Sequence, residues 1–551
     1  MARIKHLLAD ELSDALGTDI APRDVEEPDP EHGDYAYPVM QAAAEIGDNP
    51  REMAEAAADE LEEGDIIADV DVAGPGYLNM WLDREAFARE IVDTLEQDSF
   101  GVEQRDGSVL VEFSSPNVAK PMHVGHFRNN ALGDALQRIL RFVGYDVTSE
   151  NYLGDWGTQY GKLIYAFKEF GSEEAFEEAP MEHMYELYVK FHDEMEENKE
   201  LEEKGRAWAA KIEDGDEEAV ELWERFRDAS IEYHKKDYRR MGIDFDRWTG
   251  ESTVVEPARE LIEQWLDAGK LERDDDGSVF IEFQDHDLPG TVLLKADGST
   301  LYITRDLYNL KKRNEEGFDH NLYVVGSEQE LHFQQVFATA DEMGLDPSGS
   351  EHISYGLLSL PEGSMSSRAG RIVRLEDAMD EATKRAKEKA EEKMDRTVEN
   401  AEAIGIGALK YANLAVSRTK DIEFSWDRAL SFEGDSGPYL QYSNTRAKSI
   451  TAKAETDGEL VGEPTDEETE LLRKLAAFPD TVEAAAEQRE PANLANYLSA
   501  LCEEFNSFYH SCPVIQADEE TKKRRLKIVE TFIDVTDQGM ELLGIEPLAA
   551  M

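Results

Sequence analysis

Two histidines three positions apart, His123 and His126, lie where an apolar segment gives way to a helical pattern. The segment Ser108–Phe113 is typical of a short buried strand, and the residues after His126 follow helical spacing up to Gly144. A helix N-terminus after a strand favours phosphate, and imidazoles there can donate hydrogen bonds as charge develops on phosphate oxygens. Gly125 between them leaves space against the backbone. The same pair could instead cap the helix or bind a metal ion, although no further metal ligands are nearby.

A second candidate phosphate site is the glycine- and serine-containing segment Gly363–Arg374. It contains the run Met365, Ser366, Ser367 and Arg368. Hydroxyl and guanidinium groups on a flexible loop are suited to closing on a triphosphate. The alternative interpretation is an ordinary basic surface loop.

The chain is strongly acidic, with 551 residues, 121 Asp plus Glu against 57 Lys plus Arg, and a net charge of −64. That average surface repels phosphates, which argues against a nonspecific DNA-coating protein or a binder of anionic membranes. Hydrophobic residues at 41% predict a globular protein rather than a disordered acidic chain. Negative charge spread over the whole length indicates a protein from a cell with a very salty interior, where salt screens the repulsion between its carboxylates. An acidic binding or chaperone-like protein in ordinary salt is an equal alternative on composition alone.

Three windows of the sequence contain few or no acidic residues. At the average content, Phe113–Tyr145 would hold about seven acidic residues, but it holds only Asp134. Ser364–Arg374 and Ser436–Ala454 hold none, and all three windows contain lysine or arginine. Such windows are either buried core or places where an anion docks. Their cations favour anion docking.

The order of patterns predicts a multidomain α/β protein. We expect a small α/β domain over residues 1–100, with helices near the start and over Asn49–Glu62 and a turn and strand over Val72–Leu82. Residues 101–420 are expected to form a Rossmann-like parallel-sheet domain, split by an acidic helical insertion at about 169–247. Residues 421–551 contain helical patterns alone and predict an all-α domain.

With both motifs in order around a split sheet, the chain resembles the class I aminoacyl-tRNA synthetases, and specifically the arginyl-tRNA synthetase family. His123–His126 corresponds to the first class motif and Met365–Arg368 to a degenerate second one. The resemblance covers nearly the whole chain. It is also carried by five further stretches in order: Glu112–Lys120, Gly154–Gln159, Tyr302–Asp306, Gln329–His332 and Gly437–Tyr442.

The resemblance implies an enzyme that activates L-arginine with ATP and Mg²⁺ and transfers it from arginyl-adenylate to tRNA(Arg), with bound tRNA needed for activation. A planar, always charged guanidinium requires carboxylates that accept its donors. By resemblance, the guanidinium is read by Glu112, Tyr302 and Asp306, and the rest of arginine is held by Ser115, Asn117, His123 and Gln329. ATP is expected at Gly125, His126, His332 and Arg368. The alternative for Asp306 is a helix N-cap.

For tRNA, Tyr439, Tyr442 and Arg446 fall on one face of a helix in the C-terminal domain, and aromatic rings with arginine suit unpaired bases. Such tyrosines are otherwise often core. Further tRNA contacts are expected at Phe505, Tyr509 and the terminal Met551. In the first domain, the resemblance implies D-loop contacts at Tyr77 and Asn79, for which a buried strand is the alternative. The basic cluster Lys522–Lys527 is either a phosphate track or a solvated face.

The remaining expectations concern the setting of the protein. The two cysteines, Cys502 and Cys512, cannot form a disulfide framework or a zinc site, although a single disulfide between them is an alternative on sequence grounds. No metal site and no membrane segment are expected. A cytoplasmic enzyme fits these features, the resemblance implies a monomer, and the acidity favours a halophilic archaeon as its source.

One departure from the family pattern leads to a prediction. The second motif of the class usually supplies lysines, but here Arg368 ends the motif and Ala369 stands where many arginyl enzymes keep a lysine. The resemblance implies that Lys120, three residues before His123, makes up part of the missing charge at the α-phosphate side of ATP. Lys120→Ala should therefore severely lower arginyl-adenylate formation, measured by ATP–pyrophosphate exchange. Near-normal exchange in that variant would contradict this role.

Overall fold

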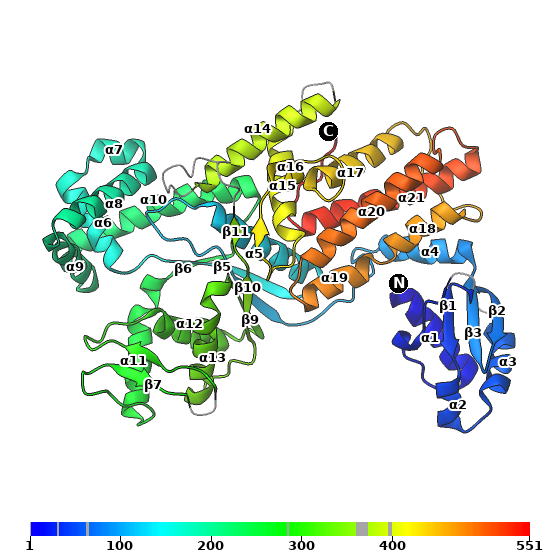
Figure 1. Ribbon diagram of the computed structural model, residues 1–551, viewed down its shortest axis with the longest axis horizontal. Helices are drawn as coiled ribbons and strands as arrows, with labels where there is room; N and C mark the ends of the chain where they lie inside the picture. The colour runs from blue at the N-terminus through cyan, green and yellow to red at the C-terminus, as the bar shows by residue number, and fades with distance from the viewer. Residues whose placement is uncertain (1, 30–31, 62–65, 284–285, 360–372, 395–398) are drawn as a thin grey trace.

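The computed structural model describes residues 2–29, 32–61, 66–283, 286–359, 373–394 and 399–551 (Figure 1). The N-terminal unit holds a three-stranded antiparallel sheet in the order β1-β3-β2, with helices packed against it. The segment Val72–Leu82 contains the end of β2, a turn, and all of β3. The elements of the N-terminal unit are α1 (Ala2–Leu16), η1 (Pro22–Asp24), β1 (Tyr35–Pro38), α2 (Met40–Ile46), α3 (Pro50–Leu61), β2 (Ile67–Ala73), β3 (Tyr77–Leu82) and α4 (Arg84–Leu95).

A parallel five-stranded sheet in the order β10-β9-β4-β5-β6 forms the centre of the molecule. Its strands are β4 (Ser108–Glu112), β5 (Asp146–Leu153), β6 (Arg247–Gly250), β9 (His320–Gly326) and β10 (Ser350–Tyr355). The register aligns Glu112 of β4 with Glu150 of β5 and with Tyr323 of β9, and Glu150 with Arg247 of β6. Through this register the polar residues form one row across the sheet, which passes the carboxyl end of β4.

The crossover from β4 to β5 is α5 (Val124–Phe142), which confirms the predicted strand, loop and helix. Most of α5 is buried. Arg128 is completely buried and donates to the backbone oxygens of Gly356 (2.9 Å) and Arg418 (3.0 Å). The cations of the acid-poor window Phe113–Tyr145 therefore do not exclude core, and the inference that they mark an anion surface was wrong for most of this helix.

The chain between β5 and β6 is a helical insertion with a core of its own. It contains α6 (Thr158–Phe170), α7 (Glu173–Glu178), α8 (Pro180–Glu197), α9 (Glu200–Glu213) and α10 (Glu217–Met241). Helix α6 packs against α8 and α9, so the unit includes residues ahead of position 169. Helix α10 extends from this group toward the central sheet (Figure 1).

Between β6 and β9 lies a second unit with a separate core. It contains η3 (Glu251–Thr253), α11 (Val255–Asp267), the antiparallel pair β7 (Val279–Ile281) and β8 (Thr291–Leu294), and α12 (Tyr302–Glu316). After β9 come η4 (Ser327–Gln329) and α13 (Glu330–Met343).

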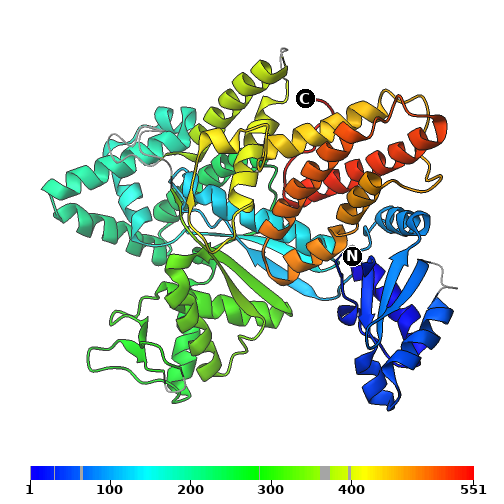
Figure 2. The same ribbon diagram turned by 45° about the vertical axis from the view of Figure 1, so that its right-hand side comes forward.

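The rest of the described chain is largely helical and packs beside the sheet domain (Figure 2). A short parallel pair joins β11 (Leu358–Ser359) to β12 (Ile422–Glu423). Both cysteines are buried and free. In the described chain, no helix is both long enough and apolar enough to cross a bilayer. The helices are α14 (Leu375–Met394), α15 (Ala401–Leu414), α16 (Trp426–Ala429), α17 (Gly437–Thr451), α18 (Asp466–Leu475), α19 (Phe478–Glu487), α20 (Ala492–Ser511) and α21 (Glu519–Leu542).

Candidate active site

Backbone hydrogen bonds join the first sequence motif to the segment that follows the second motif. Val124 N–H donates to Val373 O (3.1 Å), and Leu375 N–H donates to Met122 O (2.9 Å), so His123 and Arg374 lie side by side in an antiparallel bridge. The second motif itself, Met365–Arg368, lies outside the described residues. The chain that leaves it is nevertheless fixed against the first motif.

The two motif histidines cap α5 with one nitrogen each. His123 Nδ1 accepts from Gly125 N–H, and His126 Nδ1 accepts from His123 N–H, both at 3.1 Å. These bonds leave the Nε2 of each neutral ring as its N–H donor. Helix capping and phosphate donation, which were alternatives on sequence grounds, can therefore coexist. A Cβ at Gly125 would lie 2.8 Å from the His123 ring, so glycine is required for this packing.

Burial keeps the histidines neutral. It lowers the pKa of His126 to about 3, and it also lowers the pKa of His123. The two ring centroids are 4.0 Å apart, and a charge on His123 would further disfavour one on His126. Near neutral pH both rings are therefore uncharged donors rather than cations.

The loop between β4 and the histidines has a strained backbone. Of the non-glycine residues with positive φ that the structure describes, three lie here: Ser114 (73°), Ser115 (47°) and Ala119 (63°). Such conformations cost of order 1–3 kcal/mol each and persist only where surrounding contacts enforce them. Asn117, next to these residues, is exposed and lines the adjoining cavity.

That cavity, of about 1030 Å³, opens between the first motif and helix α8. Lys120, His123, His126 and Arg374 line one side. The Lys120 ammonium borders the cavity and lies 4.4 Å from the centre of the Tyr188 ring on α8. The opposite side is formed by α8, including Tyr185, Glu186, Val189, Lys190 and Asp193.

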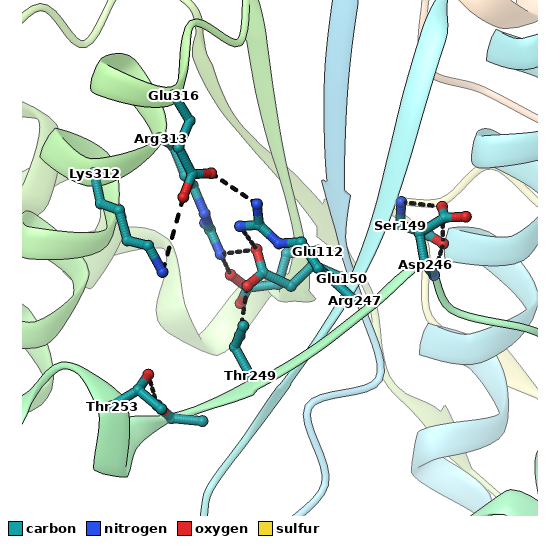
Figure 3. Close-up of polar contacts among 11 residues, drawn as sticks. Glu112, Ser149, Glu150, Asp246, Arg247, Thr249, Thr253, Lys312, Arg313 and Glu316 are labelled. Carbon is teal, nitrogen blue, oxygen red and sulfur yellow. Dashed lines mark hydrogen bonds and ion pairs between the residues drawn. The ribbon is translucent and has the colours of Figure 1, made fainter.

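The row of polar residues across the central sheet is part of a buried ionic network (Figure 3). Arg313 of α12 donates to Glu112 and, at 2.9 Å, to Glu150. Arg247 binds Glu150 (3.2 Å) and Glu316 (2.7 Å), and Thr249 donates to Glu150. Glu112, predicted to read a substrate guanidinium, thus already contacts a guanidinium of the protein itself.

The two carboxylates of this network differ in charge preference. Burial raises the pKa of Glu112 to about 7, although Arg313 opposes the shift. Burial acts in the same direction on Glu150, but Arg313, Thr249 and Arg247 hold its pKa below the usual range. Glu150 is therefore the firmly ionised partner of Arg313. Glu112 gains most from an additional positive charge nearby.

The start of α12 brings a further group to this region. Asp306 binds His332 Nε2 at 2.6 Å, and the N-cap of α12 is Leu301, so the N-cap alternative for Asp306 was wrong. Tyr302 is 67% exposed, with the Arg305 guanidinium 4.7 Å from its ring. Gln329 at the end of η4 is exposed.

Buried Glu251 adds another carboxylate beside α12. It binds Arg305 at 2.5 Å, and burial raises its pKa to about 7 despite this partner. Asp306 and Asp155 act in the same direction as burial. The surroundings of α12 are thus richer in carboxylate than the sequence indicated.

On the C-terminal helices, the predicted aromatic face is partly assembled. The Arg446 guanidinium lies between the rings of Tyr442 (4.8 Å) and Tyr509 (5.1 Å) and donates to Asn506, which in turn donates to the Tyr439 hydroxyl. Tyr509 is 40% exposed. Phe505 lies apart from this face, in the core, where its ring stacks on Phe532.

The other predicted tRNA contacts are less exposed or distant from that face. Met551 and Asn79 are buried, and Tyr77 is half-buried in β3. The cations of the cluster Lys522–Lys527 all have carboxylate partners. This pairing favours a structural surface over a free phosphate track.

Several residues of the site were missed on sequence grounds. Arg374 could have been found, because it ends an acid-free window. Glu150, Glu251 and Arg313 could not, because their roles depend on strand register and on contacts between segments far apart in the chain.

A parallel sheet with the His123–His126 motif at the start of its first crossover helix, a helical insertion and a helical C-terminal domain is the architecture of a class I aminoacyl-tRNA synthetase. Family models agree over most of the chain: tRNA synthetases class I (R), catalytic domain, matches residues 90–426; the DALR anticodon binding domain matches 440–551; and the arginyl tRNA synthetase N terminal domain matches 2–82. The chain belongs to the arginyl-tRNA synthetase family, which charges tRNA(Arg) with arginine in translation.

Individual relatives agree along the full length. The chain is 37% identical to the arginine–tRNA ligase of Halothermothrix orenii, over 98% of both chains, and 39% identical to that of Clostridium perfringens, over 95% of both. It resembles the solved Thermus thermophilus arginyl-tRNA synthetase with a TM-score of 0.79 and 26% identity, over 99% of this chain and 100% of that one.

The neutral histidines lead to a pH prediction. Because burial lowers the pKa of His126 to about 3, this ring should stay uncharged between about pH 6 and 8, where an ordinary histidine titrates, and the lowered pKa of His123 favours its neutral form too. The KM for ATP in pyrophosphate exchange should change by less than about twofold over this range, apart from the titration of ATP itself. A steep rise in KM with a midpoint near 6.5 would show that a charged imidazole is needed.

Proposed function

We propose that the edge of the central sheet binds arginine through Glu112, Tyr302 and Asp306, next to ATP at the start of α5. The observation that carries this proposal is the concentration of buried carboxylates, including Glu112 and Glu251, whose pKa values are raised by burial. A site that disfavours its own negative charge is stabilised by a bound cation. A guanidinium supplies that charge at any physiological pH and adds planar donors that match carboxylate oxygens.

The rest of arginine extends toward the strained loop in this proposal. Ser115, Asn117 and Gln329 hold its α-amino and carboxylate groups, with His123 beside them. Asn117 lines the same cavity as His123, which supports this placement. Citrulline lacks the positive charge, and lysine lacks the planar, forked donors of a guanidinium, so both should be rejected.

ATP is proposed to bind with its phosphates at His123 and His126, and with Gly125 and His332 near the nucleoside. The Nε2–H groups of the two neutral histidines donate to the phosphate on which negative charge develops as arginine attacks. Lys120 and the second-motif residues Met365, Ser366, Ser367 and Arg368 close on the triphosphate. Mg²⁺ enters as part of the ATP substrate, since it binds triphosphate oxygens with few protein ligands.

The tRNA is proposed to meet Tyr439, Tyr442, Arg446 and Tyr509 on α17 and α20. The cluster of partly exposed tyrosines around the Arg446 guanidinium supports this role, because stacking of a base on an aromatic ring is worth about 1–3 kcal/mol. Phe505 is buried apart from this face and is not part of the proposed contact. Met551 at the C-terminus and, at the D-loop, Tyr77 and Asn79 of β3 are proposed as further tRNA contacts. We further propose that the protein is a monomeric cytoplasmic enzyme of a halophile, and that it activates arginine only when tRNA is bound.

Asp306→Asn tests the arginine pocket. The substitution keeps the size of the side chain and a hydrogen bond to His332, but it removes one negative charge. The arginine KM should rise by about 100-fold, as expected for the loss of a charged hydrogen bond of about 1.5–3 kcal/mol. Exchange assays with varied arginine and with varied ATP provide the measurement.

The control for this variant is exposed Asp59→Asn, on α3 of the N-terminal unit, which should leave both KM values unchanged. An unchanged arginine KM in Asp306→Asn would contradict the assignment of this carboxylate.

The paired cations at the C-terminal end predict a weak salt dependence of tRNA binding. High salt weakens phosphate contacts steeply, so affinity here should depend more on stacking than on cation count. The slope of log K against log salt should correspond to fewer than about three released counterions. Filter binding across a range of KCl concentrations would measure it, with a mesophilic relative as the reference. A slope as steep as that of the relative would contradict the prediction.

A further inference from the structure

The strained loop Ser114–Ala119 is held at both ends by one face of α10. Ser230 and Tyr238 lie eight residues apart on this helix, so they share a face, with His234 between them. Ser230 and His234 are completely buried, and Tyr238 nearly so. The helix begins in the helical insertion and ends beside β6, so residues of the insertion reach the loop directly.

At the first end of the loop, the Tyr238 hydroxyl fixes Ser114. Asn151 Nδ2 donates to the Tyr238 oxygen (3.0 Å), which leaves the tyrosine proton for Ser114 Oγ (2.6 Å). The Tyr238 ring packs edge-on against Phe245 and Trp248, so the hydroxyl has little freedom to turn away. Ser114 is the first of the positive-φ residues.

At the other end, Ser230 fixes Ala119. Ser230 Oγ donates to Phe226 O within α10 (2.7 Å), and this bond turns its lone pairs toward the N–H of Ala119, which donates at 3.0 Å. Ala119 is the last positive-φ residue of the loop and immediately precedes Lys120.

His234 lies between these two contacts. Its pKa is lowered to about 4 by burial, and the Asn117 backbone and the His126 ring are near it. The Asn117 backbone interacts with this ring and opposes the shift, although no bond to either ring nitrogen has full hydrogen-bond geometry among the described residues. The ring therefore fills the space behind the loop as a neutral group, and the well-formed hydrogen bonds between the loop and α10 are those of Ser230 and Tyr238.

We propose that Ser230 and Tyr238 are positioning residues for arginine activation: through α10, the helical insertion holds the strained loop in the conformation that presents Ser115 and Asn117 to arginine and Lys120 to ATP. This inference rests on the proposed function of the loop residues. Neither α10 residue touches a substrate. Their effect is geometric, and a misplacement of about 1 Å at a reacting group can cost about 100-fold in rate.

Tyr238→Phe tests the arginine end of the loop, because it removes one hydroxyl and keeps the packed ring. The arginine KM in exchange with tRNA present should rise about tenfold, while the ATP KM stays within about twofold, since the α5 cap is held by its own bonds. Ser230→Ala should lower kcat about tenfold with a smaller change in the arginine KM, because it loosens the residue beside Lys120.

Tyr165→Phe is the matched control. Tyr165 is a buried tyrosine of the same insertion, and its hydroxyl contacts Lys204 of α9 at 3.3 Å. This variant should show wild-type KM values, and Tyr238→Phe should unfold at a somewhat lower temperature than this control, because it leaves buried Ser114 and Asn151 without their partner. If Tyr238→Phe kept the arginine KM of the control, or if both KM values and the unfolding temperature changed together, the positioning role would be overturned.

Calorimetric titration of arginine distinguishes this inference from the proposed function. Weaker arginine binding in Tyr238→Phe than in Tyr165→Phe supports the positioning role even without any exchange measurement. A wild-type protein that binds arginine but gives no arginine-dependent exchange would contradict the proposed function alone. Equal arginine affinity in the two variants would overturn the positioning role alone.

Discussion

The Arg313 guanidinium lies between Glu112 and Glu150, and all three side chains are almost completely excluded from water. A buried charge without its partner typically costs about 3–5 kcal/mol, so the three groups must remain together in the folded protein. Glu112 and Glu150 are fixed by adjacent strands, whereas Arg313 is carried by α12. The ion network therefore fixes α12 against the edge of the sheet.

That constraint also determines where the recognition groups lie. Asp306 and Tyr302 are two and three turns ahead of Arg313 on the same helix, and their distance from the sheet follows from the buried pair. The segment that follows the second motif is fixed in a similar way, through the backbone bonds of Val373 and Leu375 at the start of α5. In the proposed function, these two attachments to one sheet bring arginine and ATP together, which is the arrangement that adenylate formation requires.

Much of this arrangement could be predicted from the sequence, and the limits of the prediction have physical causes. The strand, loop and helix over Ser108–Gly144 were confirmed because local signals determine them: an apolar run, helical spacing and a terminating glycine. The pairing of Glu112 with Arg313 joins residues 201 positions apart and depends on strand register, which no local pattern encodes. The acid-poor window misled in part, because buried Arg128 binds backbone oxygens instead of an anion.

In the proposed function, the buried carboxylates beside α12 recognise both the charge and the shape of arginine. This recognition can be measured by pyrophosphate exchange in molar KCl, with tRNA present and with arginine, citrulline or lysine as the amino acid. We expect exchange with arginine and almost none with citrulline, which has nearly the same shape but no charge, or with lysine, which has charge but no planar guanidinium. Exchange with citrulline at a rate comparable to that with arginine would contradict it.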